Sequence, residues 1–199
     1  MTQKNISSRL SHPDYEGSAM MRATVEDDLD KVMEIIDAAR DFIAAQNIDQ
    51  WTNGYPSIDD IRNDIDNGWS YVLLNADKEI VGTAAVSFDG EPTYHQVFEG
   101  NWEYEGAYAV VHRLCIDPSM HGRGYSGLLF AGAEALAIAR EVRIIRVDTH
   151  EKNKPMRRSL VRAGYEYRGK IKLGNGDMRV AYEKYISSYG EDSEEDEKK

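Results

Sequence analysis

The sequence predicts a single domain of the mixed α/β class. Its 199 residues suffice for one domain with a well-developed core, and 41% hydrophobic residues is ordinary for a globular protein. Apolar residues recur at strand spacing or at helix spacing, in the order β, α, α, β, β, β, glycine-rich loop, α, β, α, β, β. No linker or internal repeat interrupts this order, which indicates one folding unit.

The domain is predicted to cover residues 20–186. Residues 1–19 are mostly polar and are interpreted as a flexible leader without the apolar stretch of a signal peptide. Residues 187–199 are predicted to form a disordered acidic tail, because Glu191 to Lys199 hold six acidic and two basic residues and no apolar one.

The first half of the domain is predicted to contain three strands and two helices. The first helix follows an acidic start, which suits a helix N-terminus, and Ser57 with Asp60 approximates a capping box for the second. A turn at Asp77 and Lys78 separates the second and third strands. The expected elements are a strand at 20–25, a helix at 29–43, a loop at 50–56, a helix from 57 to about 68, and strands at 71–74 and 80–88.

The second half starts with a polar, aromatic insertion at 89–105. The strand that follows is the most apolar of the chain, as expected in the middle of a sheet. Pro155 suits the first turn of a helix that Gly164 ends, and Gly-Asn-Gly-Asp at 174–177 indicates a hairpin. The expected elements are a strand at 107–116, a glycine-rich loop at 118–127, a helix, a strand at 144–147, a helix at 155–163, and strands at 165–173 and 178–185.

Gly122, Gly124 and Gly127 lie between a strand and a helix. Backbone N–H groups of such a loop converge at the positive end of a helix and can bind phosphate, whereas the alternative is a tight surface turn. The glycines also fit the dinucleotide-binding pattern G-x-G-x-x-G, with Asp148 at the expected distance. This second interpretation is disfavoured, because Pro118 ends the strand before the first glycine and too little chain follows for a doubly wound sheet.

Residues 111–129 resemble the central motif of the GNAT N-acetyltransferases, in which Q/R-x-x-G-x-G/A follows an apolar strand and a proline. Here His121 occupies the Gln/Arg position and Ser126 the last Gly/Ala position. Residues 146–165 are similar to the family's later motif, with Asn153 at the entry of a helix, and residues 21–29 resemble its usual opening. The resemblance extends over residues 20–184.

The resemblance implies an acetyl-CoA-dependent N-acetyltransferase with a central, mostly antiparallel sheet, a splayed central strand and flanking helices. Because dimers are common in the family, the resemblance is compatible with a homodimer. Asn153 would bind the pantetheine arm or cap its helix, and both roles can coexist. The residues implied to bind the coenzyme are Leu114, Cys115, Ile116, His121, Gly122, Arg123, Gly124, Tyr125, Ser126, Gly127 and Asn153.

The reaction needs a base, because an ordinary amine with a pKa near ~10.4 is almost fully protonated at neutral pH. His112 is the predicted catalytic base: an imidazole suits proton removal at neutral pH, and on a strand His112 should share the face of Leu114. A structural histidine is the alternative. The carboxylates considered as other bases are Asp89, Glu91, Glu103 and Glu105.

The general acid is left open, because Leu160 stands where many family members have a tyrosine. Another group, such as Tyr165 or a water, could replace it, or the acid is dispensable. The acceptor is expected to be a small-molecule or peptide amine. Aromatic side chains in loops with acidic neighbours could surround a cationic amine, although such side chains often serve packing alone. The predicted substrate residues are Trp51, Tyr55, Glu103 and Tyr104.

Composition disfavours several other functions. A net charge of −11 argues against a nucleic-acid partner, which requires a basic face. Cys115 has no second cysteine to pair with and is interpreted as buried and structural, and the histidines show no metal-ligand spacing, so no metal is expected. No apolar run reaches the ~20 residues of a membrane span, so no membrane partner is expected and the cytoplasm is predicted. The alternative to an enzyme is an acetyl-CoA-binding module without turnover.

Overall fold

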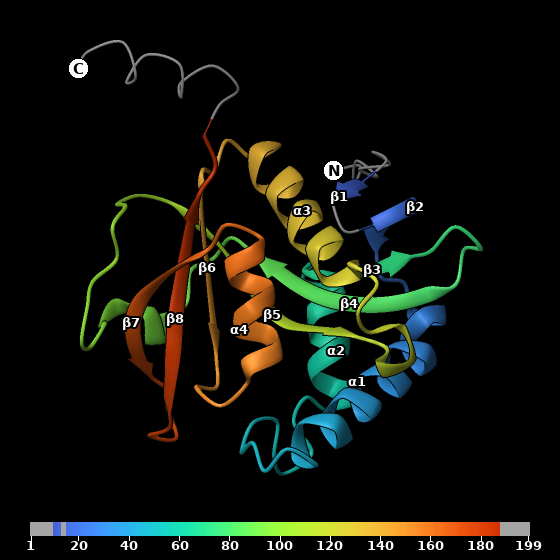
Figure 1. The fold of residues 1–199 in the computed structure, drawn as a ribbon, viewed down its shortest axis with the longest axis horizontal. Coiled ribbons are helices and arrows are strands. Elements are labelled where there is room, and N and C mark those ends of the chain that lie inside the picture. The colour runs from blue at the N-terminus through green and yellow to red at the C-terminus, as the bar shows by residue number, and fades with distance from the viewer. Residues whose placement is uncertain (1–9, 13–14, 188–199) are drawn as a thin grey trace.

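The structure, a computed structural model, describes residues 10–12 and 15–187. In this part of the chain an eight-stranded sheet is flanked by α-helices (Figure 1). The strands are β1 (Leu10–His12), β2 (Tyr15–Ala23), β3 (Ser70–Leu74), β4 (Ile80–Ser87), β5 (Tyr108–Ile116), β6 (Ile144–Thr149), β7 (Glu166–Lys172) and β8 (Met178–Tyr185). The helices are α1 (Leu29–Ala44), α2 (Ile58–Asp66), α3 (Tyr125–Ile138) and α4 (Lys154–Arg162), with short 3-10 helices η1 (Glu26–Asp28), η2 (Pro92–His95) and η3 (Pro118–Met120).

The strand order is β1-β2-β3-β4-β5-β6-β8-β7, and every neighbouring pair is antiparallel except β5 and β6. The parallel pairing joins Tyr108–Val110 to Ile144–Arg146 and stops well before the ends of the two strands. Figure 1 shows β6, β8 and β7 running across the direction of β4 and β5 beyond this point. The predicted α/β fold, with a mostly antiparallel sheet splayed at its central strand, is therefore confirmed.

Helices cover both faces of the sheet. The largest core cluster lies under α3 and includes Leu160 of α4, whereas a second cluster lies under α1 and α2. Val72 of β3 belongs to the second cluster and its neighbours Tyr71 and Leu73 to the first. Because successive side chains of a strand point to opposite faces, the two clusters lie on opposite sides of the sheet.

The predicted capping box is present at the start of α2. The backbone N–H of Asp60 donates to Oγ of Ser57 at 3.2 Å, and the backbone N–H of Ser57 donates to Oδ2 of Asp60 at 2.7 Å. Two N–H groups that have no partner within the helix are thereby satisfied. This local signal fixes where α2 begins and therefore where its buried side chains lie.

The N-terminal boundary differs from the prediction. β1 and residues 15–19 of β2 fall in the stretch interpreted as a flexible leader, and that interpretation is wrong for these residues. Pairing of Leu10 with Ala19 and of His12 with Tyr15 uses backbone groups, so a polar sequence does not prevent it. Residues 188–199, nearly all of the predicted acidic tail, lie outside the described residues.

Within residues 10–12 and 15–187, none of the helices is long and apolar enough to cross a membrane.

Candidate active site

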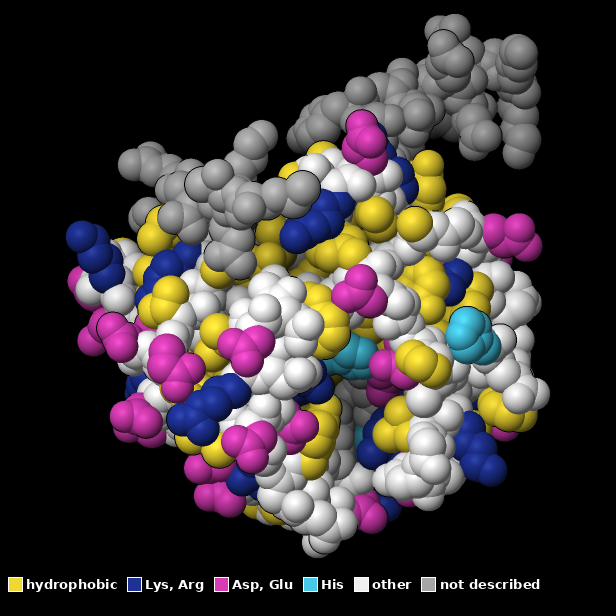
Figure 2. All heavy atoms as spheres, turned by 180° about the vertical axis from the view of Figure 1, so that it is seen from behind, with side chains coloured by type: hydrophobic (Ala, Val, Ile, Leu, Met, Phe, Trp, Pro, Cys, Tyr) yellow, Lys and Arg dark blue, Asp and Glu magenta, His cyan; other side chains and the backbone are white. Residues whose placement is uncertain are grey.

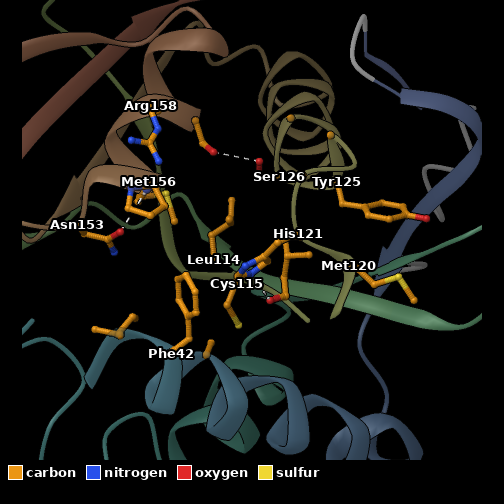
Figure 3. Close-up of a pocket in the computed structure, with 18 of the residues that line it drawn as sticks. Phe42, Leu114, Cys115, Met120, His121, Tyr125, Ser126, Asn153, Met156 and Arg158 are labelled. Atoms are coloured by element: carbon orange, nitrogen blue, oxygen red, sulfur yellow. Dashed lines mark hydrogen bonds between the residues drawn. The ribbon is translucent and has the colours of Figure 1, made fainter. Parts of the chain in front are cut away.

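A cavity of about 670 Å³ opens beside the glycine-rich loop. Its walls come from α1, the end of β5, the loop, the start of α3 and α4 (Figure 3). All of the residues expected to contact the coenzyme line this cavity, except Arg123. The motif thus brings together side chains and backbone that are up to about 40 positions apart along the chain.

Two glycines shape the loop at the mouth of this cavity. Gly122 and Gly124 have φ values of 78° and 79°, a region that only glycine adopts without steric penalty. A Cβ at Gly122 would meet no atom within 4 Å, so backbone conformation and not crowding favours glycine there. Gly124 is also the N-cap of α3 and supplies no capping side chain. Because Gly124 and the first residues of α3 line the cavity, the positive end of this helix lies at the cavity wall.

Arg158 and Arg162 of α4 line the same cavity, and neither was singled out from the sequence. They lie four residues apart and therefore share one face of the helix. Figure 3 shows Arg158 on the side of the cavity where Ser126 lies in the first turn of α3. The hydroxyls of Ser126 and Ser159 are 3.1 Å apart and join the two helices at this point. These cations and the end of α3 make this part of the cavity suited to an anion.

Asn153 and His121 hold the walls of the cavity together. Oδ1 of Asn153 accepts the backbone N–H of Met156 at 3.2 Å, so Asn153 does cap α4, and its amide donates to Oε1 of Gln50 at 3.2 Å. The His121 ring nitrogen Nε2 lies 3.2 Å from the carbonyl oxygen of Ile116, and its ring packs edge-on against Phe42.

A β-bulge interrupts β5 at Arg113. His112 pairs with Ala85 and Cys115 with Thr83, so two residues of β5 lie opposite one of β4, and Arg113 has a φ of 52°. The extra residue resets the alternation of side chains along the strand. Val111 and Leu114 consequently both pack in the cluster under α3, whereas Cys115 packs under α1 and α2.

Because of the bulge, the prediction that His112 shares the face of Leu114 is wrong. With strict alternation it would share the face of Leu114, but the extra residue places it on the opposite face. The same change puts Cys115 on the side of His112. Burial nevertheless raises the pKa of Cys115 to about 12, which keeps the thiol protonated and disfavours a nucleophilic role.

Arg113 and Asp64 form a buried ion pair beneath the bulge, which sequence reasoning missed. The guanidinium donates to both oxygens of Asp64, at 2.7 and 2.5 Å, and to the hydroxyl of Tyr55 at 2.6 Å. The side chains are 16% and 1% exposed. Burial alone would lower the pKa of Arg113, but the bonds to Asp64 and Tyr55 outweigh it and raise the pKa. The pair therefore ties the bulge to α2 and to the loop that carries Tyr55.

A second cavity, of about 490 Å³, adjoins the first. Both are lined by Gln50, Trp51, Leu114 and Met156, so they meet where β5 and β6 separate. The second cavity also contains His112 and Tyr55. In Figure 2 the surface is hollowed near its centre, and histidine, acidic and basic side chains gather around the hollow. Of the predicted substrate residues, Trp51 and Tyr55 thus lie where an acceptor could bind.

Glu103 and Tyr104, the other two predicted substrate residues, line neither cavity. Their backbone N–H groups instead donate to the fully buried carboxylate of Glu183 on β8, at 2.9 and 3.3 Å. The ring of Tyr104 stacks on Tyr185 at 4.8 Å. This part of the insertion supplies hydrogen-bond donors to the buried carboxylate of Glu183 and packs against β8.

The imidazole of His112 lies against the carboxylate of Glu91 in the second cavity. Its Nε2 lies 3.3 Å from Oε2 of Glu91, and its side chain is 27% exposed. The hydrogen bond to His112 lowers the pKa of Glu91 to about 2. Four carboxylates line this cavity, opposed by Arg113 and Arg179. Those carboxylates belong to Asp89, Glu91, Asp148 and Asp177.

The protein's relatives identify its family. A sequence model of the acetyltransferase (GNAT) family matches residues 36–165, more than half of the chain. The chain belongs to this family. No curated protein sequence matches it significantly.

Solved GNAT structures share the fold. A GNAT family acetyltransferase from Streptococcus agalactiae is 32% identical, with a TM-score of 0.80 over 90% of this chain and 99% of that one. One from Listeria monocytogenes is 21% identical, with a TM-score of 0.65 over 85% and 95%. An aminoglycoside acetyltransferase solved with coenzyme A is also 21% identical, with a TM-score of 0.60 over 84% and 95%. The chain is accordingly a GNAT acetyltransferase, an acyltransferase of this fold.

Tyr165 is poorly placed to be the general acid of this GNAT acetyltransferase. It is 2% exposed, packs against Phe130 and lines neither cavity. Burial raises the pKa of its hydroxyl well above the usual value, and no hydrogen-bond partner for that hydroxyl occurs among the described residues. Leu160 is fully buried in the core.

No group of three or more His, Cys, Asp and Glu side chains is positioned to hold a metal ion in the part of the GNAT acetyltransferase that the structure describes.

Proposed function

We propose that the chain transfers the acetyl group of acetyl-CoA to a primary amine by direct attack on the thioester. One observation carries the proposal: two cavities meet at the splay of β5 and β6, where Leu114 and Met156 line both. An acceptor in the second cavity would reach a thioester held in the first. Bringing two reactants together in this way removes much of the entropic barrier to their reaction.

The residues of the first cavity fit the coenzyme. The N-terminus of α3 with Gly122 and Gly124, together with Arg158 and Arg162, would bind its phosphates. Backbone N–H groups of 114–116, where β5 has separated from β6, would stabilise the negative charge that develops on the carbonyl oxygen. Bound acetyl-CoA supplies the thioester that the amine attacks.

His112 would take a proton from the bound ammonium, and the nitrogen lone pair freed in this way would attack the thioester carbonyl to form the C–N bond. The C–S bond then breaks, and a water would protonate the departing thiolate. The four carboxylates of the second cavity favour an acceptor that carries positive charge, which the small-molecule and peptide amines expected from the sequence include. Trp51 lines the same cavity, and its ring would contact a cationic amine through a cation–π interaction.

A panel of amines tests this function. Purified chain, acetyl-CoA and monoamines, diamines, aminoglycosides or lysine peptides are incubated, and thiol release and acetylated product are both measured. We expect product with at least one cationic amine and slower reaction with neutral or anionic amines of similar size.

The second candidate is an acetyl-CoA-binding module without turnover. It is favoured by Leu160, a buried residue where many family members carry a tyrosine acid. Tight binding of acetyl-CoA with no acetylated product from any amine class would support this candidate and refute the transferase.

A further inference from the structure

Glu91 presents a carboxylate whose two oxygens have different partners. Oε1 accepts the backbone N–H of Thr93 at 3.0 Å and the hydroxyl of Thr93 at 2.8 Å. Oε2 lies 3.3 Å from Nε2 of His112. The backbone N–H of Glu91 donates to the hydroxyl of Tyr108 at 3.2 Å. Glu91 is the N-cap of η2, and the hydrogen bonds from Thr93 hold its carboxylate in place independently of the imidazole.

The surroundings of His112 orient its ring as well. Its ring centroid is 6.3 Å from that of Tyr94, which is 1% exposed and donates its hydroxyl to Oδ1 of Asp148 at 2.7 Å. Arg113, the next residue along β5, is turned toward Asp64. Glu91 is therefore the carboxylate that contacts the imidazole of His112 directly.

We propose that Glu91 is a positioning residue for the acetyl transfer and acts through His112. Oε2 accepts the proton on Nε2, so the neutral ring keeps its other nitrogen, Nδ1, unprotonated and able to take the proton of the amine. When Nδ1 takes that proton, the cation that forms lies against the Glu91 carboxylate. This inference rests on the proposed function, and it goes further by assigning the basic atom and the residue that fixes it.

The geometry distinguishes this role from that of a base acting directly. Oε1 of Glu91 already accepts two hydrogen bonds from Thr93, and Oε2 lies 3.3 Å from Nε2 of His112, so a proton from the amine would have to displace Thr93 or His112. The low pKa of Glu91, about 2, also makes it a weak proton acceptor at neutral pH. Carboxylate, imidazole and substrate in this order are a common arrangement for holding the correct tautomer of a catalytic histidine.

A double-mutant cycle tests the coupling. Glu91→Gln, His112→Ala and the double variant are compared by kcat and by KM for acetyl-CoA, once circular dichroism has shown each to be folded. We expect kcat to fall roughly 10- to 100-fold in Glu91→Gln and 10²- to 10⁴-fold in His112→Ala, with KM for acetyl-CoA within about twofold. The double variant should be no slower than His112→Ala alone, because Glu91 then has no histidine to act through.

Glu99→Gln is the matched control. Glu99 lies in the same insertion and pairs with Lys170 at 2.9 Å, but its side chain is 65% exposed and lines neither cavity. We expect no change in kcat. A full Glu91→Gln loss that persists in the His112→Ala background would mean that Glu91 acts directly on the substrate, and unchanged kcat in Glu91→Gln would mean that it does not act at all. Either result overturns the inference.

A readout without turnover separates this inference from the proposed function. Nitrogen-15 NMR of the His112 ring in the wild-type chain reports which nitrogen carries the proton. We expect the proton on Nε2 and a broader, more averaged signal in Glu91→Gln. A proton on Nδ1 in the wild-type chain would overturn the inference even if every amine is acetylated. A chain that acetylates none but shows the Nε2 proton would overturn only the proposed function.

Discussion

Replacing Asp64 by alanine should destabilise the protein strongly, because it leaves Arg113 as an unpaired charge in the core. Arg113 is 16% exposed and loses two hydrogen bonds, at 2.7 and 2.5 Å, with only the Tyr55 hydroxyl remaining as a partner. Removing one member of a buried ion pair costs about 3–5 kcal/mol. The φ of 52° at Arg113 costs a non-glycine residue roughly 1–2 kcal/mol, but the wild-type chain already bears this cost, so it does not add to the loss.

Urea unfolding followed by circular dichroism measures this loss. With a slope of about 2–3 kcal/mol per molar urea for a chain of this size, the midpoint should fall by roughly 1–2 M. Asp59→Ala is the control: that side chain is 89% exposed and 3.8 Å from Arg62, so its loss should cost no more than about 1 kcal/mol. Adding Arg113→Met to Asp64→Ala should recover part of the stability. A midpoint that falls by less than about 0.3 M in Asp64→Ala would refute the reasoning.

The remaining predictions concern the coenzyme loop, Glu91 and Trp51. Gly124→Val should abolish coenzyme A binding in a calorimetric titration, because φ is 79° there and a β-branched residue adopts that conformation only with strain that would distort the loop. Gly174→Ala, with no atom within 4 Å of its Cβ, should bind normally. An unchanged Kd for Gly124→Val would count against a phosphate site. The Glu91 pKa is depressed from 4.5 to about 2, so its stabilisation is fully present above pH 4.5 and is lost as pH falls toward 2. The difference in unfolding free energy between the wild-type chain and Glu91→Gln should therefore shrink below pH 4.5, and a difference independent of pH would contradict the pairing with His112. Trp51→Ala should raise KM for both acetyl-CoA and the amine, since Trp51 lines both cavities, and a change in only one KM would show that the cavities act separately.

Much of the first cavity, beside the glycine-rich loop, could be predicted from the sequence. Gly122 and Gly124 are neighbours along the chain, and the conformations they require depend on local backbone sterics. The Ser57 capping box and the spacing of apolar residues are local as well, so they located the helices and strands around the loop. For these elements a short stretch of sequence already contains the interactions that determine the structure.

The arrangement of residues around the second cavity depends on contacts between segments that are far apart in the sequence. Arg113 and Asp64 are 49 residues apart, and only their pairing in the folded chain shows what supports the bulge that turns His112 away from the face of Leu114. Periodicity assumes that side chains alternate, and one extra residue reverses the face of every side chain that follows it.

The insertion at 89–105 shows the same limit. It contains acidic residues whose roles the sequence could not separate. In the fold, Glu91 meets His112, whereas Glu103 and Tyr104 cover the buried carboxylate of Glu183, 80 and 79 residues further along the chain. The sequence by itself determined the family, the order of elements from β2 onward and the glycine-rich loop, because these depend on local conformation and periodicity. The tertiary structure alone decided which carboxylate lies against the histidine, because that depends on which strands and loops the sheet places side by side.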